Sequence, residues 1–239
     1  MGTDSIAEVW DRVVGTQPDP SLPVVVATGL VALAVVAPRG VWRVTRNAVT
    51  IAHEGGHGIV ALLTGRRLEG IRLHSDTSGL TVSRGKPSGI GMVLTSAAGY
   101  TAPPLLGLAG AWLLADGRVT ALLWGATALL LAMLVMVRNA YGVLTVVLTG
   151  GTFFLVSWFA GTEVQGAFAY GVVWFLLLGG VRPVVELQAK RRRGEAPDSD
   201  ADQLARLTRL PALLWVGVFL LVDVAALALA ARCARATPC

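Results

Sequence analysis

The chain has 239 residues, of which 54% are hydrophobic and only 15% are charged, and its mean hydropathy is +0.64. Soluble domains carry about 25% charged residues, so this composition excludes an ordinary soluble domain and indicates an integral membrane protein. The formal net charge is +5, and the basic residues are mostly arginines in short segments between apolar runs. That distribution is typical of the cytoplasmic loops of membrane proteins rather than of a nucleic-acid-binding surface, so we expect no nucleic-acid partner.

Residues 1–20 are polar and predict a short N-terminal tail. Apolar runs follow along the chain, at about 22–38, 88–115, 119–137, 140–160, 164–181 and 209–231. With the motif helix described next, these runs predict an all-α polytopic membrane protein of about six to seven transmembrane helices. We expect one membrane-embedded domain over 21–232 and a C-terminal tail at 233–239. Glycines and prolines within 88–115 predict a kinked or broken helix there.

One motif stands out in the second apolar segment, a predicted helix at about 46–65. It contains His53-Glu54-Gly55-Gly56-His57, and two of the chain's three histidines belong to it. Helical residues four apart lie on one face, so His53 and His57 can offer nitrogen atoms to one metal ion. An ionisable residue inside an apolar span is a candidate functional residue. The alternative is a polar helix face packed against neighbouring helices.

The chemistry of this motif favours hydrolysis assisted by Zn²⁺. A catalytic zinc ion takes three protein ligands and keeps one open position, so two imidazoles leave one protein ligand to be found. Glu54 follows His53 directly and is not expected to bind the metal. Its carboxylate can accept a proton from the attacking water, which is the role of the base in such sites.

Residues 66–87 predict a β-hairpin directly after the motif helix. Apolar residues alternate with polar ones at Ile71 and Leu73 and again at Leu80 and Val82, with a turn sequence between the two runs. The edge of such a hairpin could hold an extended substrate by backbone pairing, and the alternative is an ordinary surface hairpin. His74 and Asp76, at the turn, are spaced like ligands, but a solvated turn is favoured.

The segment 188–203 is the most polar of the chain and is predicted to be a cytoplasmic loop because it contains a run of basic residues, Lys190 to Arg193. Ser199 and Asp202 resemble a capping box at the start of another helix. Basic residues flank the motif helix on both sides, and we favour access to the metal site from the cytoplasm.

Three further polar residues lie in or beside apolar spans. Asp223 lies in the middle of the last one, where a charged side chain usually faces the bundle interior. A structural polar contact is favoured over metal ligation for this residue. Arg182 and Glu186 can form an i,i+4 ion pair, and Glu186 is also a candidate third metal ligand.

Several motifs together resemble the membrane-embedded M50 metallopeptidases, the site-2-protease class, and in particular their short M50B-like branch. The resemblance covers about residues 45–232. It is carried by six segments: Ala52-His-Glu-Gly-Gly-His-Gly58 with Ala61-Leu-Leu-Thr-Gly65, Ser78-Gly-Leu-Thr81, Ser96-Ala-Ala-Gly-Tyr100, Arg138-Asn-Ala-Tyr-Gly142, Gly180-Val-Arg-Pro183, and Ser199-Asp-Ala-Asp-Gln-Leu204 leading to Leu210-Pro-Ala-Leu-Leu-Trp215.

The resemblance implies a zinc ion on His53 and His57, with Glu54 as the base, and cleavage of a peptide bond within or beside the membrane. It also implies a multi-pass protein of the cell membrane. The better-studied site-2 proteases take their third ligand from an Asn-Pro…Asp-Gly element, which this chain lacks. By resemblance to the short branch, Asp200 is the first candidate for the third ligand and Glu186 is the second.

Two functions of different classes follow from these observations. The first is a zinc-dependent endopeptidase that acts on a membrane-anchored protein or peptide within the lipid bilayer. The second is a catalytically inactive scaffold or substrate-binding pseudoprotease with the same fold. The intact motif favours the enzyme, and the absent Asn-Pro…Asp-Gly element favours the scaffold.

Overall fold

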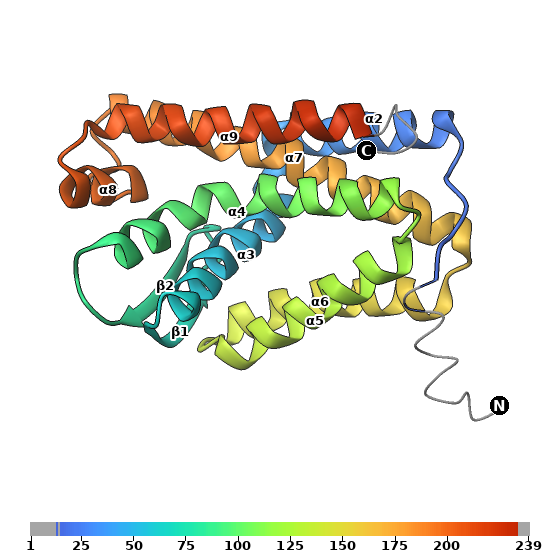
Figure 1. The fold of residues 1–239 in the computed structure, drawn as a ribbon, viewed down its shortest axis with the longest axis horizontal. Helices are drawn as coiled ribbons and strands as arrows, with labels where there is room; N and C mark the ends of the chain where they lie inside the picture. The colour runs from blue at the N-terminus through green and yellow to red at the C-terminus, as the bar shows by residue number, and fades with distance from the viewer. Residues whose placement is uncertain (1–12, 14, 234–239) are drawn as a thin grey trace.

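The computed structural model describes residue 13 and residues 15–233, and it is a helical assembly with one β-hairpin, as the sequence predicts (Figure 1). Most of the predicted N-terminal tail and residues 234–239 lie outside the described residues. In chain order the elements are α2 (Leu22–Val36), α3 (Arg39–Leu63), β1 (Arg67–Leu73), β2 (Gly79–Arg84), α4 (Ile90–Ala115), α5 (Val119–Met136), α6 (Ala140–Phe159), α7 (Thr162–Arg192), α8 (Asp200–Thr208) and α9 (Ala212–Cys233).

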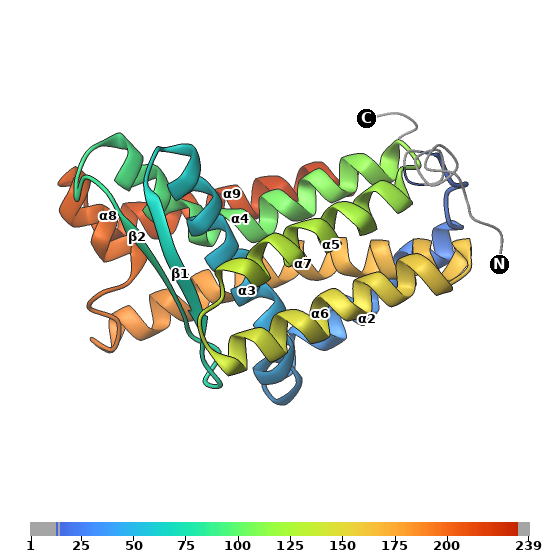
Figure 2. The same ribbon diagram turned by 90° about the horizontal axis from the view of Figure 1, so that it is seen from below.

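Helices α4, α7 and α9 pack against one another and form the centre of the fold. The largest apolar core combines side chains of these helices and of α5, among them Leu114, Leu123, Leu177 and Ala230. Helix α3 packs along α4, α2 along α7, and α5 pairs with α6. The hairpin and α8 lie at the same end of the molecule (Figures 1 and 2). Polar residues of the hairpin and of α8 are therefore at one end of the fold.

Four helices among the described residues are long and apolar enough to cross a membrane: α5, α6, α7 and α9. Helices α2 and α3 are bent by 106° relative to each other. They add a fifth span if the two are counted as one broken span. The predicted count of six to seven spans is therefore not confirmed. Helix α2 has only 15 residues, α3 carries the charged motif, and the glycines, prolines and hydroxyl residues of α4 lower its hydropathy.

The motif helix is longer than predicted, because it begins at Arg39 rather than near residue 46. Pro38 has an extended backbone and precedes the first turn of α3, which suits a residue that lacks an N–H donor. Arg182 of α7 donates hydrogen bonds to the carbonyl groups of Val36 and Ala37 at the end of α2. These bonds satisfy helix-terminal acceptors and hold the bend between α2 and α3.

Helix α4 is continuous from Ile90 to Ala115, so of the predicted kink or break within 88–115 a break is not observed. Pro103 and Pro104 lie inside the helix, where the rest of the packed bundle compensates for the hydrogen bonds that they remove. A methyl group at Gly56 of α3 would lie 2.4 Å from the Cβ atom of Ala102. Small residues therefore let α3 and α4 approach closely beside the motif.

The predicted hairpin is confirmed, with β1 and β2 antiparallel and Ile71 opposite Thr81. Ile71 and Leu73 are buried, whereas Leu80 and Val82 are exposed. The outer edge of β1 is occupied, because the amide of Arg138 donates to the Ile71 carbonyl at 2.9 Å. The side chain of Asn139 also bonds both backbone groups of Leu73. The hairpin is thus fixed between α3 and the segment joining α5 to α6.

Helix α7 continues through Pro183 to Arg192, so the predicted loop from 188 shortens to residues 193–199. Val184 and Leu187 extend the helix because they pack against α8 and α9.

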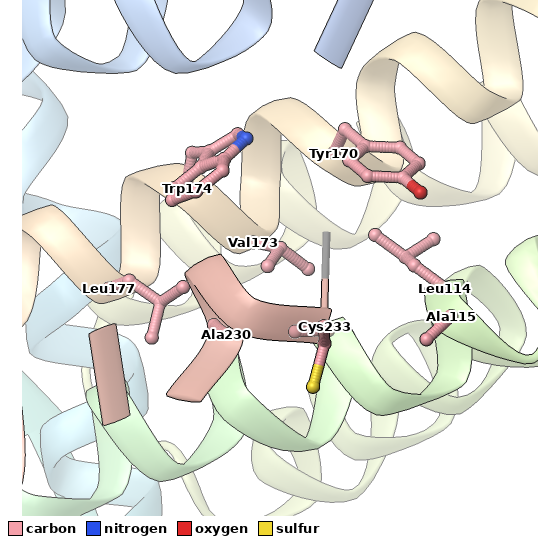
Figure 3. A pocket seen from close by; sticks show the side chains of 9 residues that line it. Leu114, Ala115, Tyr170, Val173, Trp174, Leu177, Ala230 and Cys233 are labelled. Atoms are coloured by element: carbon pink, nitrogen blue, oxygen red, sulfur yellow. The ribbon is translucent and has the colours of Figure 1, made fainter. Parts of the chain in front are cut away.

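A cavity of about 20 Å³ lies between α4, α7 and α9, lined by Leu114, Tyr170, Trp174 and Cys233 among others (Figure 3). It has room for about one water molecule, and it lies near the C-terminal ends of α4 and α9, away from the motif.

Candidate metal centre

Helix α3 presents the two motif histidines to one point, as their spacing predicts. The Nε2 atoms of His53 and His57 lie 3.2 Å apart, and the two rings meet edge to face at 4.8 Å between centroids. Both side chains are mostly buried, with 20% and 12% of their surface exposed. Two nitrogen lone pairs thus converge in a sheltered position.

A carboxylate from a distant part of the chain completes this cluster. Asp200 is the first residue of α8, and its Oδ2 atom lies 3.2 Å from His53 Nε2 and 3.3 Å from His57 Nε2. Helix α8 begins here because the Ser199 side chain accepts a hydrogen bond from the Asp202 amide, which confirms the predicted cap. The cap therefore fixes the position of the carboxylate.

The three ligand atoms fit a tetrahedral zinc ion. They form a nearly equilateral triangle with edges of 3.2–3.3 Å. Zinc–ligand distances of about 2.0–2.1 Å imply ligand–ligand separations of about 3.3 Å in a tetrahedron. Two imidazoles with one carboxylate are also a ligand set that catalytic zinc sites use. The structure thus brings together His53, His57 and Asp200, the three residues predicted as metal ligands.

Contacts behind the ligands favour their metal-binding forms. The Nδ1 atom of His57 lies 2.6 Å from the Thr95 carbonyl oxygen. A carbonyl can only accept, so Nδ1 carries a proton, and Nε2 is the atom at which a metal ion would bind. Burial acts to raise the pKa of Asp200, but its interactions with His57 and His53 outweigh burial and hold the pKa below its usual range. Asp200 is therefore a carboxylate at neutral pH.

Glu54 is held by the hairpin. Its side chain is 4% exposed, and the Thr81 hydroxyl lies 2.6 Å from its Oε2 atom and donates to it. Gly79, on the same face of β2, lies so close that a methyl group there would be 2.4 Å from Oε1. The hairpin therefore both orients the carboxylate of Glu54 and encloses it.

Gly99 of α4 forms the wall opposite the two imidazoles. A methyl group at this position would lie 2.4 Å from His57 Nε2 and 2.5 Å from His53 Nε2. Any side chain there would enter the space between the ligand atoms. Tyr100, the next residue, contacts the ring of His53 edge to face at 4.8 Å and stacks on Phe219 at 5.0 Å.

Other candidate residues lie outside the cluster. Glu186 pairs instead with Arg182 at 2.9 Å, as predicted, and with Arg46 at 3.3 Å. His74 and Asp76 lie in the exposed turn of the hairpin, where both interact with Ser78. Asp223 is fully buried, as its place in the last span predicts. Neither of its oxygens has a hydrogen-bond partner among the residues described, so the predicted polar contact is not found.

Four residues around the cluster have no role that the sequence alone predicts: Thr81, Thr95, Gly99 and Tyr100. Three of them belong to the family-like segments quoted above, and the alternation of β2 places Thr81 on the same face as Gly79. Nothing in the sequence alone indicates that this face meets Glu54. The Thr95 carbonyl carries no sequence signal, since any residue type provides it.

Comparison with protein families identifies one model, described as Peptidase M50B-like, that matches residues 26–230. The match includes both histidines of the motif, Glu54 and Asp200. Comparison with curated proteins and with solved structures finds no match.

Proposed function

Since the chain belongs to the peptidase M50B-like family, we propose that it is a zinc-dependent intramembrane endopeptidase. In this proposal it hydrolyses a peptide bond in or near the membrane segment of a membrane-anchored protein. It acts as a multi-pass protein of the cell membrane, with the lipid bilayer around its apolar helices. The observation that carries the proposal is the triangle of ligand atoms from His53, His57 and Asp200. Glu54, the neighbour of His53 in the chain, has its carboxylate held by Thr81.

His53, His57 and Asp200 would hold the zinc ion. When bound, zinc supplies Lewis acidity, which makes water a stronger nucleophile at neutral pH and polarises a carbonyl group. Glu54 accepts the proton of the attacking water and passes it to the leaving amine. The Thr81 hydroxyl holds the Glu54 carboxylate during these transfers, and the Thr95 carbonyl holds the ring of His57.

The hairpin offers a place for the substrate backbone. The outer edge of β1 is occupied by Arg138 and Asn139, whereas no strand among the described residues pairs with the outer edge of β2. An extended peptide that added to this edge would have its backbone hydrogen-bonded. It would also pass the face that carries Gly79 and Thr81, against which Glu54 is packed.

The inactive-scaffold alternative loses its main support. It rested on the missing Asn-Pro…Asp-Gly element, yet Asp200 supplies a carboxylate to the cluster from a different part of the chain. No observation in the structure favours a scaffold over an enzyme.

The experiment that tests the proposal compares the purified wild type with Glu54→Gln on a pool of membrane-segment peptides. We expect one zinc ion per chain in both proteins, because Glu54 is not a ligand. Cleavage should fall by at least about a hundredfold in the variant, because a general base is lost. Zinc-independent cleavage, or equal cleavage by Glu54→Gln, would contradict the proposed function.

A further inference from the structure

A second cavity, of about 360 Å³, opens beside the candidate metal centre. We call it the α7–α8 pocket, because it lies between the last turns of α7 and the loop that leads into α8, with Arg46 of α3 in its wall. Tyr100 and Ser199 also line it. Tyr100 contacts His53, and Ser199 precedes Asp200, so a peptide held at the metal ligands has its neighbouring residues within reach of this pocket.

Every carboxylate that lines the α7–α8 pocket is already paired with an arginine. Glu186 pairs with both Arg46 and Arg182, as described above. The two other carboxylates are nearer the surface, and each pairs with an arginine outside the pocket lining: Glu195 with Arg193 at 2.9 Å and Asp198 with Arg206 at 3.6 Å. These acidic groups therefore leave little negative potential for a cationic ligand.

Two cationic side chains of the pocket can interact with a further anionic group. The side chain of Lys190 is exposed and has no ion-pair or hydrogen-bond partner within the described part of the chain. Arg46 pairs with Glu186 through its Nη1 atom, and 27% of its side chain is exposed in the pocket wall. The exposed part of its guanidinium group can therefore also interact with an anion in the pocket. The lining has two cationic side chains and three carboxylates. The arginines that pair with these carboxylates from outside the lining, Arg182, Arg193 and Arg206, raise the cationic total to five.

We infer that the α7–α8 pocket binds a carboxylate of the substrate, the side chain of an Asp or Glu residue close to the scissile bond. This inference rests on the proposed function and specifies its substrate class: peptides with an acidic residue at one position beside the cleaved bond. A carboxylate offers two acceptor oxygens in the plane that a guanidinium edge requires. Its single charge suits a pocket that also contains paired carboxylates better than a phosphate group does.

A lipid phosphate is the competing ligand, since Lys190 belongs to a basic segment at the end of an apolar helix. The position of the pocket favours the substrate. Its wall includes a residue that contacts a metal ligand and one that adjoins another, so an occupant of the pocket lies against the peptide being cleaved.

The test uses zinc-loaded Glu54→Gln protein, which is expected to bind peptides without cleaving them, in nanodiscs of neutral lipid. A random pool of membrane-segment peptides is equilibrated with it, and the retained peptides are sequenced by mass spectrometry. We expect Asp and Glu to be enriched at least about fivefold at one position. Adding Lys190→Glu should abolish that enrichment, whereas Lys86→Glu should preserve it. The chain has two lysines, and Lys86 lies at the end of the hairpin, outside the pocket.

The outcomes separate this inference from the proposed function. Retained peptides without acidic enrichment, or enrichment that survives Lys190→Glu, would overturn the carboxylate pocket. Cleavage of the same pool by the wild-type protein would still support the peptidase. If Lys190→Glu changes only the binding of phosphatidylglycerol added to the nanodiscs, the pocket is a lipid site and the inference is wrong. If the wild type shows no zinc-dependent binding or cleavage of any peptide, the proposed function itself fails.

Discussion

At the scale of single residues, Gly99 sets the room available to the candidate ligands. We predict that Gly99→Ala weakens zinc binding at least about tenfold, because the added methyl group would lie 2.4 Å and 2.5 Å from the two imidazole nitrogens. Zinc affinity is measured by competition with a chromophoric chelator. Gly125→Ala in α5 is the matched control, since nothing lies within 4 Å of the position of its new methyl group. Equal zinc affinity in the two variants would show that Gly99 does not bound the site.

The contact between Thr81 and Glu54 makes a separate prediction. Thr81→Val removes a hydrogen bond to a charged group, so kcat/KM should fall about tenfold while the zinc content stays unchanged. Thr81→Ser keeps the hydroxyl and should restore most of the activity. The measurement compares the peptide cleavage rates and the zinc content of the wild type, Thr81→Val and Thr81→Ser. If Val and Ser at this position gave the same rate, the hydroxyl would have no part in holding the base.

Local periodicity explains which residues of the site could be predicted from the sequence. The i,i+4 relation of His53 and His57 holds for any helix, so their convergence follows from the motif alone. The Gly99 wall and the Thr81 hydroxyl depend on where α4 and the hairpin meet α3. Such long-range packing has no signature in one sequence. Asp200 was expected from family resemblance and not from spacing, for the same reason.

At the scale of elements, α8 holds its ligand in place through one ion pair with α7, between Arg191 and Asp202. We predict that Arg191→Gln weakens zinc binding about threefold, the order expected for a partly exposed ion pair, although it touches no ligand. Hydrogen exchange of the α8 amides should rise as well. Arg192→Gln, one residue along, removes an exposed charge without a partner among the described residues. If both variants behaved alike, the ion pair would not position α8.

The same ion pair gives α8 a pH dependence. Burial acts to raise the pKa of Asp202, but hydrogen bonds from Arg191 and Ser199 outweigh it and lower the pKa below its ordinary value of 3.8. A carboxyl whose pKa is lowered by folding stabilises the fold above that ordinary value and ceases to do so as the pH falls. The stabilisation of α8 by Asp202 is therefore fully present at neutral pH and lost progressively below pH 3.8.

The elements themselves were largely predictable. Apolar runs gave α4, α5, α6 and α9 within a few residues, and alternation gave the hairpin. The errors occurred where tertiary packing decides. Helix α7 continues past Pro183 because Val184 and Leu187 find partners on α8 and α9, and α3 begins early because the bend after α2 is tied to α7 by Arg182.

At the scale of the whole molecule, the predicted topology places the hairpin and the metal centre on the cytoplasmic side. A cysteine at the exposed position Ser75, in a background lacking Cys233 and Cys239, should react with an impermeant thiol reagent only after the membrane is opened. A cysteine at Asp116 should react in intact cells, because it lies just before α5, which is apolar enough to span a membrane and contacts the hairpin at its other end. The reverse labelling pattern would invert the topology.

A substitution of the buried Asp223 tests whether zinc binding depends only on His53, His57 and Asp200. An ionised carboxylate without a partner in an apolar site costs several kcal/mol, and Asn has nearly the same shape without a charge. We predict that Asp223→Asn leaves zinc binding unchanged and keeps or raises the thermal stability of the protein. A loss of zinc in this variant would show that the metal centre depends on a carboxyl outside the cluster of His53, His57 and Asp200.

The most direct test of the metal centre is the zinc content per chain of the purified protein, measured by mass spectrometry after dialysis against a weak chelator. The account predicts about one zinc ion in the wild type, in Glu54→Gln and in Glu186→Gln. It predicts almost none in His53→Ala, His57→Ala and Asp200→Asn, because each removes one of three ligands. Full zinc content in Asp200→Asn together with its loss in Glu186→Gln would contradict the ligand set, and a wild type that binds no zinc would contradict the metal centre itself.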